Sequence, residues 1–216
     1  VTLELTGITV SFNSAPLEWW LSLPIIVIYP LLFGWVSYQT ATKLAEHKRR
    51  LQVMSTRDGM TGVYNRRHWE TMLRNEFDNC RRHNRDATLL IIDIDHFKSI
   101  NDTWGHDVGD EAIVALTRQL QITLRGSDVI GRFGGDEFAV IMSGTPAESA
   151  ITAMLRVHEG LNTLRLPNTP QVTLRISVGV APLNPQMSHY REWLKSADLA
   201  LYKAKKAGRN RTEVAA

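Results

Sequence analysis

Cysteine is almost absent from this chain of 216 residues, and what the sequence lacks already narrows its class. Cys80 is the sole cysteine, which excludes an internal disulfide and fits a reducing compartment. The sequence also has no internal repeat and no low-complexity tract. Its length allows one domain of roughly 150 residues plus an extra segment. The chain starts at Val1 without Met, so we expect it to be part of a longer protein.

A strong charge of either sign is also missing. The formal net charge is +3, and residues 1–56 hold four Lys and Arg against three acids, which leaves 21 against 19 in the remainder. A nearly balanced domain is a poor electrostatic match for the phosphates of duplex DNA. We therefore expect no nucleic-acid partner.

One long apolar run is present, and it predicts a transmembrane helix over residues 19–38. Trp20 to Tyr38 contains no charged residue. At ~1.5 Å per residue the run approaches the ~30 Å hydrocarbon core of a bilayer. Lys43 and three further basic residues follow it, so the positive-inside rule places the rest of the chain in the cytoplasm. A buried helix of a soluble protein is the alternative, and residues 1–18 are either an outside loop or the end of an earlier helix.

The segment 39–57 contains no Pro or Gly and is rich in helix formers, which predicts a helical linker. Leu44 and Leu51 are seven residues apart and Met54 follows three later. This spacing suits a parallel coiled coil, but a plain helical linker explains it equally well.

Residues 58–216 show an order of elements that predicts an α+β domain. Periodicity predicts a helix over 66–82, a buried strand over 88–92, a short helical or irregular piece over 96–102, a helix reaching Leu124, a hairpin over 129–142, a helix over 146–165, a strand over 172–178 with one wet face, a helix over 190–207 and an edge strand over 211–214. This order suits a central, mostly antiparallel sheet flanked by helices, with the split βαβ topology of nucleotidyl cyclases and polymerase palms.

Acidic residues occur at two ends of predicted strands. Asp136 and Glu137 directly follow the turn Gly134-Gly135, and Asp93 and Asp95 end the buried strand. Carboxylates there are costly unless they are paired or bind a metal. Taken alone, Asp136 and Glu137 could simply lie at a solvated hairpin tip. Asp93 or Asp95 alone could form a structural salt bridge. Together the two pairs favour a divalent metal that carries a nucleotide's phosphates.

Other polar residues surround these acids in the sequence and leave alternatives open. Lys98 is close enough to Asp93 to address the same phosphates, and Asn101 and Asp110 either bind a nucleobase edge or, for the acid, cap a helix. His106 has no other His or Cys at ligand spacing, which favours a structural role. Arg125 and Asp128 are three residues apart and could form a local ion pair. Lys205 and Arg209 are four residues apart, and their charges could either complement a helix C-terminus or bind a phosphate.

Motifs across the domain resemble those of one family. In order they are Asp58-x-Met60-Thr61-Gly62-x-x-Asn65-Arg66-Arg67, Asp93-Ile94-Asp95-His96-Phe97-Lys98, Asn101-Asp102, Gly105-His106-x-x-Gly109-Asp110, Gly134 to Phe138 and Lys205-x-x-Gly208-Arg209-Asn210. They resemble the GGDEF family, the diguanylate cyclases that join two GTP into cyclic di-GMP. Met60 is the one departure, since the family usually has Leu there. The whole chain is similar to enterobacterial membrane cyclases of the AdrA type, in which a MASE-type sensor precedes this domain in the bacterial inner membrane.

The resemblance implies a role for each matching position. Mg²⁺, with Mn²⁺ as the alternative, is held by Asp93, the Ile94 carbonyl and Asp136, with Glu137 close by. Either Asp136 or Glu137 deprotonates the attacking ribose 3′-OH. The remaining roles are guanine recognition by Asn101 and Asp110 beside His106, triphosphate neutralisation by Lys98, Lys205 and Arg209, and product binding at an inhibitory RxxD site formed by Arg125 and Asp128. Since each domain holds one GTP, the resemblance also implies a homodimer.

Three other functions compete with this interpretation. The domain could be a degenerate receptor for GTP or cyclic di-GMP, although Asp93, Asp136, Glu137 and Lys98 are all intact. A membrane scaffold that binds partners would leave the acidic residues unexplained. Another nucleotidyltransferase of similar fold is separable by product analysis.

Overall fold

The computed structural model describes residues 2–5, 8–11, 28–44, 56–167, 169 and 171–215. The chain divides into two compact units, Val1–Met54 and Ser55–Ala216.

The first unit holds a short hairpin and a helical segment. β1 (Thr2–Leu5) pairs antiparallel with β2 (Ile8–Ser11), in the stretch where the sequence predicts a loop or a helix end. Residues 28–44 are helical and their side chains are exposed. Among the residues described, no helix is both long enough and apolar enough to cross a bilayer. Residues 19–27 of the predicted span and 45–55 of the predicted linker lie outside the described residues.

The second unit is built around a six-stranded mixed sheet in the order β3-β5-β6-β4-β7-β8. The three central pairings are antiparallel and the two outer ones are parallel, which confirms the α+β class and the mostly antiparallel sheet. Its strands are β3 (Tyr64–Asn65), β4 (Ala87–Ile94), β5 (Val129–Arg132), β6 (Glu137–Ser143), β7 (Ile176–Pro182) and β8 (Thr212–Val214). Its helices are α2 (Arg66–His83), α3 (Phe97–Trp104), α4 (His106–Thr123), α5 (Ala147–Thr163) and α6 (Tyr190–Lys206).

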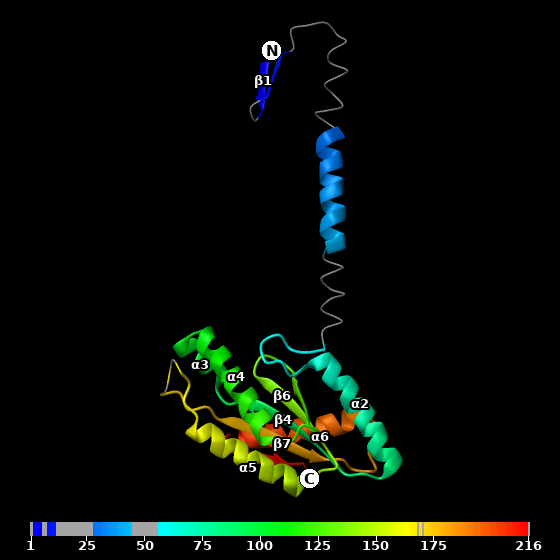
Figure 1. Ribbon diagram of the computed structural model, residues 1–216, viewed down its shortest axis with the longest axis vertical. Helices are drawn as coiled ribbons and strands as arrows, with labels where there is room; N and C mark the ends of the chain where they lie inside the picture. The colour runs from blue at the N-terminus through cyan, green and yellow to red at the C-terminus, as the bar shows by residue number, and fades with distance from the viewer. Residues whose placement is uncertain are drawn as a thin grey trace. The chain divides into compact units, whose positions relative to one another are not determined.

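Helices cover both faces of this sheet, as Figure 1 shows. Alternate side chains of β4 point to opposite faces, so Leu90 and Ile92 pack in one cluster with α4 and α5. Leu89 and Ile91 pack in the other cluster with α2 and α6. Because β4 is buried along its whole length, its carboxyl end carries Asp93 to the rim of a rigid core.

Close approach of α6 to the sheet depends on Gly179 in β7. A Cβ built at this position would lie 2.2 Å from the Ala197 carbonyl oxygen and 2.3 Å from the Leu201 nitrogen. On the same helix the Trp193 indole N–H donates to the Ala181 carbonyl over 2.8 Å. These contacts fix the axis of α6, and therefore the position of Lys205 near its C-terminal end.

Two details of the sequence predictions about this unit are wrong. The strand predicted over 172–178 with one wet face is β7 at Ile176–Pro182, and it is buried on both faces because α6 lies against it and a helical layer covers each side. Val172 and Leu174 are buried but precede the strand. α4 ends at Thr123, one residue before the predicted end, and Leu124 caps the helix while it still packs in the core with Ile113, Leu116 and Leu120 as predicted.

Candidate active site

The acidic residues predicted to form a site meet where β4 and β6 pair. Asp93 at the end of β4 lies opposite Glu137 at the start of β6. The Ile94 N–H donates to the Asp136 carbonyl over 3.3 Å, so the hairpin turn is joined to the strand end. The structure therefore brings together two pairs that are distant from each other in the sequence, Asp93 with Ile94 and Asp136 with Glu137.

Lys205 reaches this cluster from α6. Its Nζ lies 2.7 Å from Asp93 Oδ2, and the Asp93 side chain is only 12% exposed. Burial raises the pKa of the Asp93 carboxyl above its usual value, Lys205 opposes that rise, and the negative charges of Asp136 and Glu137 add to it. In this structure Lys205 thus neutralises the acid that the sequence assigns to a metal.

Arg132 holds the glycine turn in shape, a role that the sequence analysis missed. Its guanidinium donates to the Gly134 carbonyl over 3.2 Å and to the Gly135 carbonyl over 2.7 Å. It also lies 3.1 Å from Asp58 Oδ1. Asp58 accepts from the Thr61 N–H and hydroxyl as well. The start of the domain is thereby linked to the turn that carries Asp136. An Arg two residues before the Gly-Gly turn is the signal that the sequence offers.

The predicted base-binding residues lie where α3 packs against α4. A Cβ at Gly109 would lie 1.9 Å from Asn101 Oδ1 and 3.3 Å from Phe97 Cζ, so the missing side chain lets Asn101 rest on α4 beside Asp110. Asn101 Oδ1 is buried and has no hydrogen-bond partner among the described residues. Buried polar atoms normally have a partner, so this oxygen suits a ligand's N–H. Asp110 and His106 are exposed at the start of the same helix.

Lys98 and Arg209 are the other two predicted cations. Lys98 is exposed in the first turn of α3, five residues after Asp93. Arg209 follows α6 and is exposed, with a positive φ of 62°. Among the described residues neither side chain forms a hydrogen bond or an ion pair that would hold it back from a phosphate, whereas Lys205 would have to leave Asp93.

The donor set fits a small divalent cation. Within the described residues no three side chains of His, Cys, Asp or Glu form a complete metal site. Mg²⁺ does not require one, because it is usually held by one or two carboxylates together with substrate phosphates. Asp93, the Ile94 carbonyl and Asp136, which the sequence analysis assigns to a metal, would supply oxygen ligands of that kind. The raised pKa of Asp93 also identifies a buried carboxyl that a nearby cation would stabilise.

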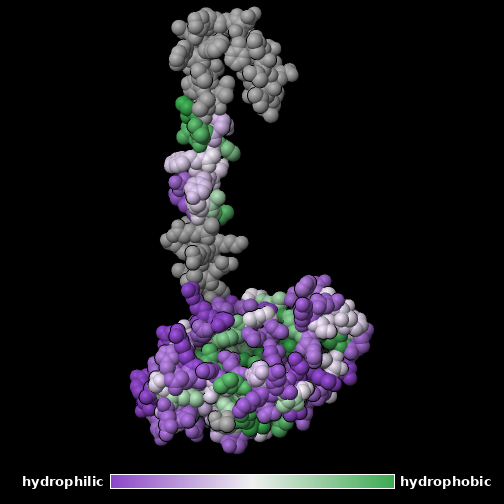
Figure 2. All heavy atoms as spheres, turned by 180° about the vertical axis from the view of Figure 1, so that it is seen from behind, coloured by the Kyte–Doolittle hydropathy of each residue, from purple (hydrophilic) through white to green (hydrophobic). Residues whose placement is uncertain are grey.

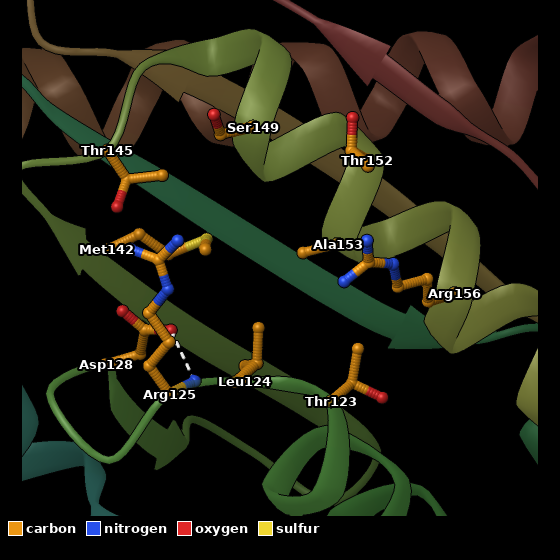
Figure 3. Close-up of a pocket in the computed structure, with 10 residues that line it drawn as sticks. All are labelled: Thr123, Leu124, Arg125, Asp128, Met142, Thr145, Ser149, Thr152, Ala153 and Arg156. Carbon is orange, nitrogen blue, oxygen red and sulfur yellow. Dashed lines mark hydrogen bonds between the residues drawn. The ribbon is translucent and has the colours of Figure 1, made fainter.

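A separate cavity of about 230 Å³ contains the predicted inhibitory pair. Arg125 and Arg156 both extend their guanidinium groups into it (Figure 3). The Arg125 N–H donates to Asp128 Oδ2 over 2.9 Å, while Asp128 Oδ1 is buried with no partner among the described residues. Burial raises the pKa of Asp128, an effect that Arg125 opposes. No ion pair joins the two described side chains, so the local ion pair considered from the sequence is not formed. Arg156, on α5, was missed because nothing in its spacing links it to residue 125.

The fold and the acidic cluster are typical of the palm-type α+β domains found in nucleotidyltransferases. Residues 55–211 match the family described as "Diguanylate cyclase, GGDEF domain", and the chain belongs to this family. It is 35% identical over 159 residues to diguanylate cyclase DosC of Escherichia coli, which covers 73% of this chain and 34% of DosC. It is 30% identical over 193 residues to cyclic di-GMP phosphodiesterase NbdA of Pseudomonas aeruginosa, covering 83% of this chain and 25% of NbdA.

A solved structure shares the fold. The coiled coil and GGDEF domain of DgcB from Caulobacter crescentus, in complex with c-di-GMP, aligns with a TM-score of 0.72 and 28% identity over 85% of this chain and 99% of that one. The chain spans about a third or less of the length of the two curated relatives. The α+β prediction and the resemblance to the GGDEF family are confirmed at the level of the domain.

Proposed function

We propose that this chain condenses two GTP into cyclic di-GMP and two pyrophosphates, using Mg²⁺ and acting as a homodimer with one GTP per subunit. The observation that carries the proposal is the meeting of Asp93 with Asp136 and Glu137 across paired strands, with Lys205 on the same carboxylate. Mn²⁺ offers the same oxygen preference and is the alternative cation.

Each group of residues has a separate role in the proposed reaction. Asp93, the Ile94 carbonyl and Asp136 would hold the cation, which supplies charge neutralisation at the triphosphate. Lys98, Lys205 and Arg209 neutralise the phosphate oxygens. Asp136 or Glu137 accepts the proton of the ribose 3′-OH. The 3′-oxygen then bonds to the α-phosphorus of the partner's GTP as the bond to pyrophosphate breaks. Repeating the step in the other direction closes the ring, which is why two facing domains are needed.

Product analysis tests this proposal. The chain is incubated with GTP and Mg²⁺, and the products are separated and identified by mass. Cyclic di-GMP with two pyrophosphates per ring supports the proposal. Binding of GTP or cyclic di-GMP without turnover would instead support the receptor function, and a linear or different product would support another nucleotidyltransferase.

The base pocket gives a prediction about specificity. We expect Asn101→Ala and Asp110→Ala to reduce discrimination of GTP over ATP by at least about tenfold each, the scale of one hydrogen bond to a buried polar group. The measurement is kcat/KM with each nucleotide. Asp107→Ala, in the same helical turn as Asp110, is the matched control and should keep the preference. Equal losses with both nucleotides would show that the guanine assignment is incorrect.

The cavity with Arg125 is proposed as the site of product inhibition. The planar guanidinium group of an arginine can donate two parallel hydrogen bonds to a phosphate or to a guanine edge. The unpartnered Oδ1 of Asp128 can accept from a guanine N–H. Met142, which lines the cavity, lies near the end of β6 opposite to Asp136. At ~3.3 Å per residue the two sites are roughly 20 Å apart. Bound product therefore acts at a distance, by favouring an arrangement in which the two GTP molecules cannot meet.

We expect Arg125→Ala and Arg156→Ala to keep the initial rate and to lose the slowing that develops as product accumulates. The concentration of cyclic di-GMP for half inhibition should rise at least about tenfold, as a charge-assisted contact is removed. Progress curves with and without added product measure this. Arg118→Ala removes an arginine of α4 outside this cavity and should remain inhibited. Wild-type inhibition in both Arg125→Ala and Arg156→Ala would contradict the assignment.

We also propose that residues 19–38 span the inner membrane with the GGDEF domain in the cytoplasm. Support comes from the large apolar side chains exposed on the described helix, including Leu31 at 68% and Phe33 at 64%. Figure 2 shows apolar residues gathered at the N-terminal end of this helix. Exposed apolar side chains of this density suit lipid rather than water.

Protease accessibility checks this topology. Protease added to sealed inside-out vesicles should release a fragment that starts near residue 40, because the basic linker faces the outside of such vesicles. Right-side-out spheroplasts are the control and should protect the domain. Cleavage in spheroplasts with protection in inverted vesicles would reverse the orientation, and release of the intact chain by a carbonate wash would exclude a membrane span.

A further inference from the structure

Asp95, the second acid after β4, has no role in the reaction described above, yet it is only 6% exposed. The Ser177 hydroxyl donates to its Oδ1 over 2.6 Å, and the Asn210 backbone N–H donates to its Oδ2 over 2.8 Å. Its own N–H donates to the Arg175 carbonyl over 2.9 Å. Both carboxylate oxygens are thus engaged by the protein, one by β7 and the other by the segment after α6.

The segment that Asp95 holds has an unusual backbone. Gly208, Arg209 and Asn210 have φ of 110°, 62° and 45°, so three successive residues lie in the left-handed region. Arg209 and Asn210 adopt this conformation with side chains that disfavour it, and such turns persist only when surrounding contacts hold them. The Arg209 N–H to Ala204 carbonyl bond closes the helix end, and the Asp95 carboxylate fixes the next residue.

Two carboxylates at the end of β4 therefore fasten the end of α6 to the sheet. Asp93 binds the Lys205 side chain, and Asp95 binds the backbone five residues later. The first contact is lost when Lys205 turns to a phosphate. The second involves no group with a role in the proposed nucleotide site, so the reaction need not break it.

We propose that Asp95 is a positioning residue, which holds the turn 208–210 so that Lys205 and Arg209 face the triphosphate of the nucleotide. The inference rests on the proposed nucleotide site. It assigns Asp95 a geometric role, carried by the length of its side chain and by the oxygen that accepts from the Asn210 N–H. A role as a further metal ligand would instead depend on its charge.

Two substitutions separate these roles on the full chain. Asp95→Asn removes the charge but keeps the length of the side chain. Its carbonyl oxygen can still accept from the Asn210 N–H, and its amide NH₂ can donate to the Ser177 hydroxyl. Asp95→Glu keeps the charge but moves both oxygens by one methylene. We expect the Asn variant to stay within about threefold of wild type in KM for GTP. The Glu variant should raise KM about tenfold or more, the scale of a displaced charge-assisted contact, with a smaller change in kcat.

A second measurement uses equilibrium binding of α,β-methylene-GTP and of guanosine in Mg²⁺. The Glu variant should lose affinity for the triphosphate and keep its affinity for guanosine, because the base pocket lies on α3 and α4. Ser177→Ala is the matched control, since it removes the donor to Oδ1 and leaves the Asn210 contact. Its KM should stay near that of wild type.

The proposal is overturned if Asp95→Asn is impaired as much as Asp95→Glu, since charge would then matter more than geometry. It is also overturned if Asp95→Glu only lowers the melting temperature while KM and triphosphate affinity stay unchanged. If wild type binds the analogue but makes no cyclic di-GMP from GTP, the proposed function fails while the binding comparison still decides the role of Asp95.

Discussion

Cyclic di-GMP synthesis should fall by at least ~100-fold in Asp136→Asn, the scale of one lost electrostatic contact in an active site. Asn keeps the shape of the side chain but removes the charge that a divalent cation needs at this position. Asp136 lies at the hairpin turn and is joined to β4 through its backbone carbonyl, which the substitution leaves intact. The fold should therefore persist, with a melting temperature close to that of wild type. Initial rates with saturating GTP and Mg²⁺ measure the loss.

Asp78→Asn is the matched control, because it makes the same change at an exposed acid of α2 and should leave the rate unchanged. Turnover at the wild-type level in Asp136→Asn would refute Asp136 as an essential ligand. A rate lost together with the melting transition would show instead that the acid supports the fold.

The largest effect on stability is expected for Gly179→Ala. The new Cβ would meet backbone atoms of α6, the Ala197 oxygen and the Leu201 nitrogen, which cannot rotate away as a flexible side chain can. Relief requires the helix to move off the sheet. We expect a loss of about 3 kcal/mol or more, at the upper end for overpacking. In a domain of this size that corresponds to a fall in melting temperature of roughly 6–12 °C.

Thermal unfolding followed by circular dichroism measures this fall. Gly126→Ala is the control, since a Cβ there meets nothing within 4 Å and its φ is ordinary. A Gly179→Ala protein that melts with wild-type cooperativity at the wild-type temperature would mean that α6 is not held against β7 as the structure has it. GTP affinity should fall with stability, because Lys205 moves with the helix.

Much of the domain follows from local patterns in the sequence. The continuous apolar run ending in Asp93 predicts a central strand, and the Gly-Gly turn predicts a hairpin that carries Asp136. Both are present, and they are neighbours in the sheet. Helix positions were also predictable within a few residues, because caps and apolar periodicity act over short distances.

Features that depend on distant partners were not predictable. Alternation over 172–178 indicated a half-exposed strand, but the register and burial of β7 are set by β4 on one side and β8 on the other. The contact of Arg132 with Asp58 spans 74 residues, and that of Asp95 with Asn210 spans 115. Arg156 belongs to the cavity of Arg125 only because α5 crosses beside that loop. No local spacing encodes such meetings.

The ion pair between Asp93 and Lys205 has a consequence for how ligands load. A cation that arrives alone must compete with an ammonium group already in place, and it leaves Lys205 without a partner in a half-buried position. A cation that arrives with a triphosphate provides new oxygens for Lys205 to bind. In the proposed site Lys205 would therefore make the two ligands mutually dependent, so that each would raise the affinity of the site for the other by the same factor. Loading would then exchange one cationic partner of Asp93 for another, and the buried carboxylate would keep a positive charge beside it throughout.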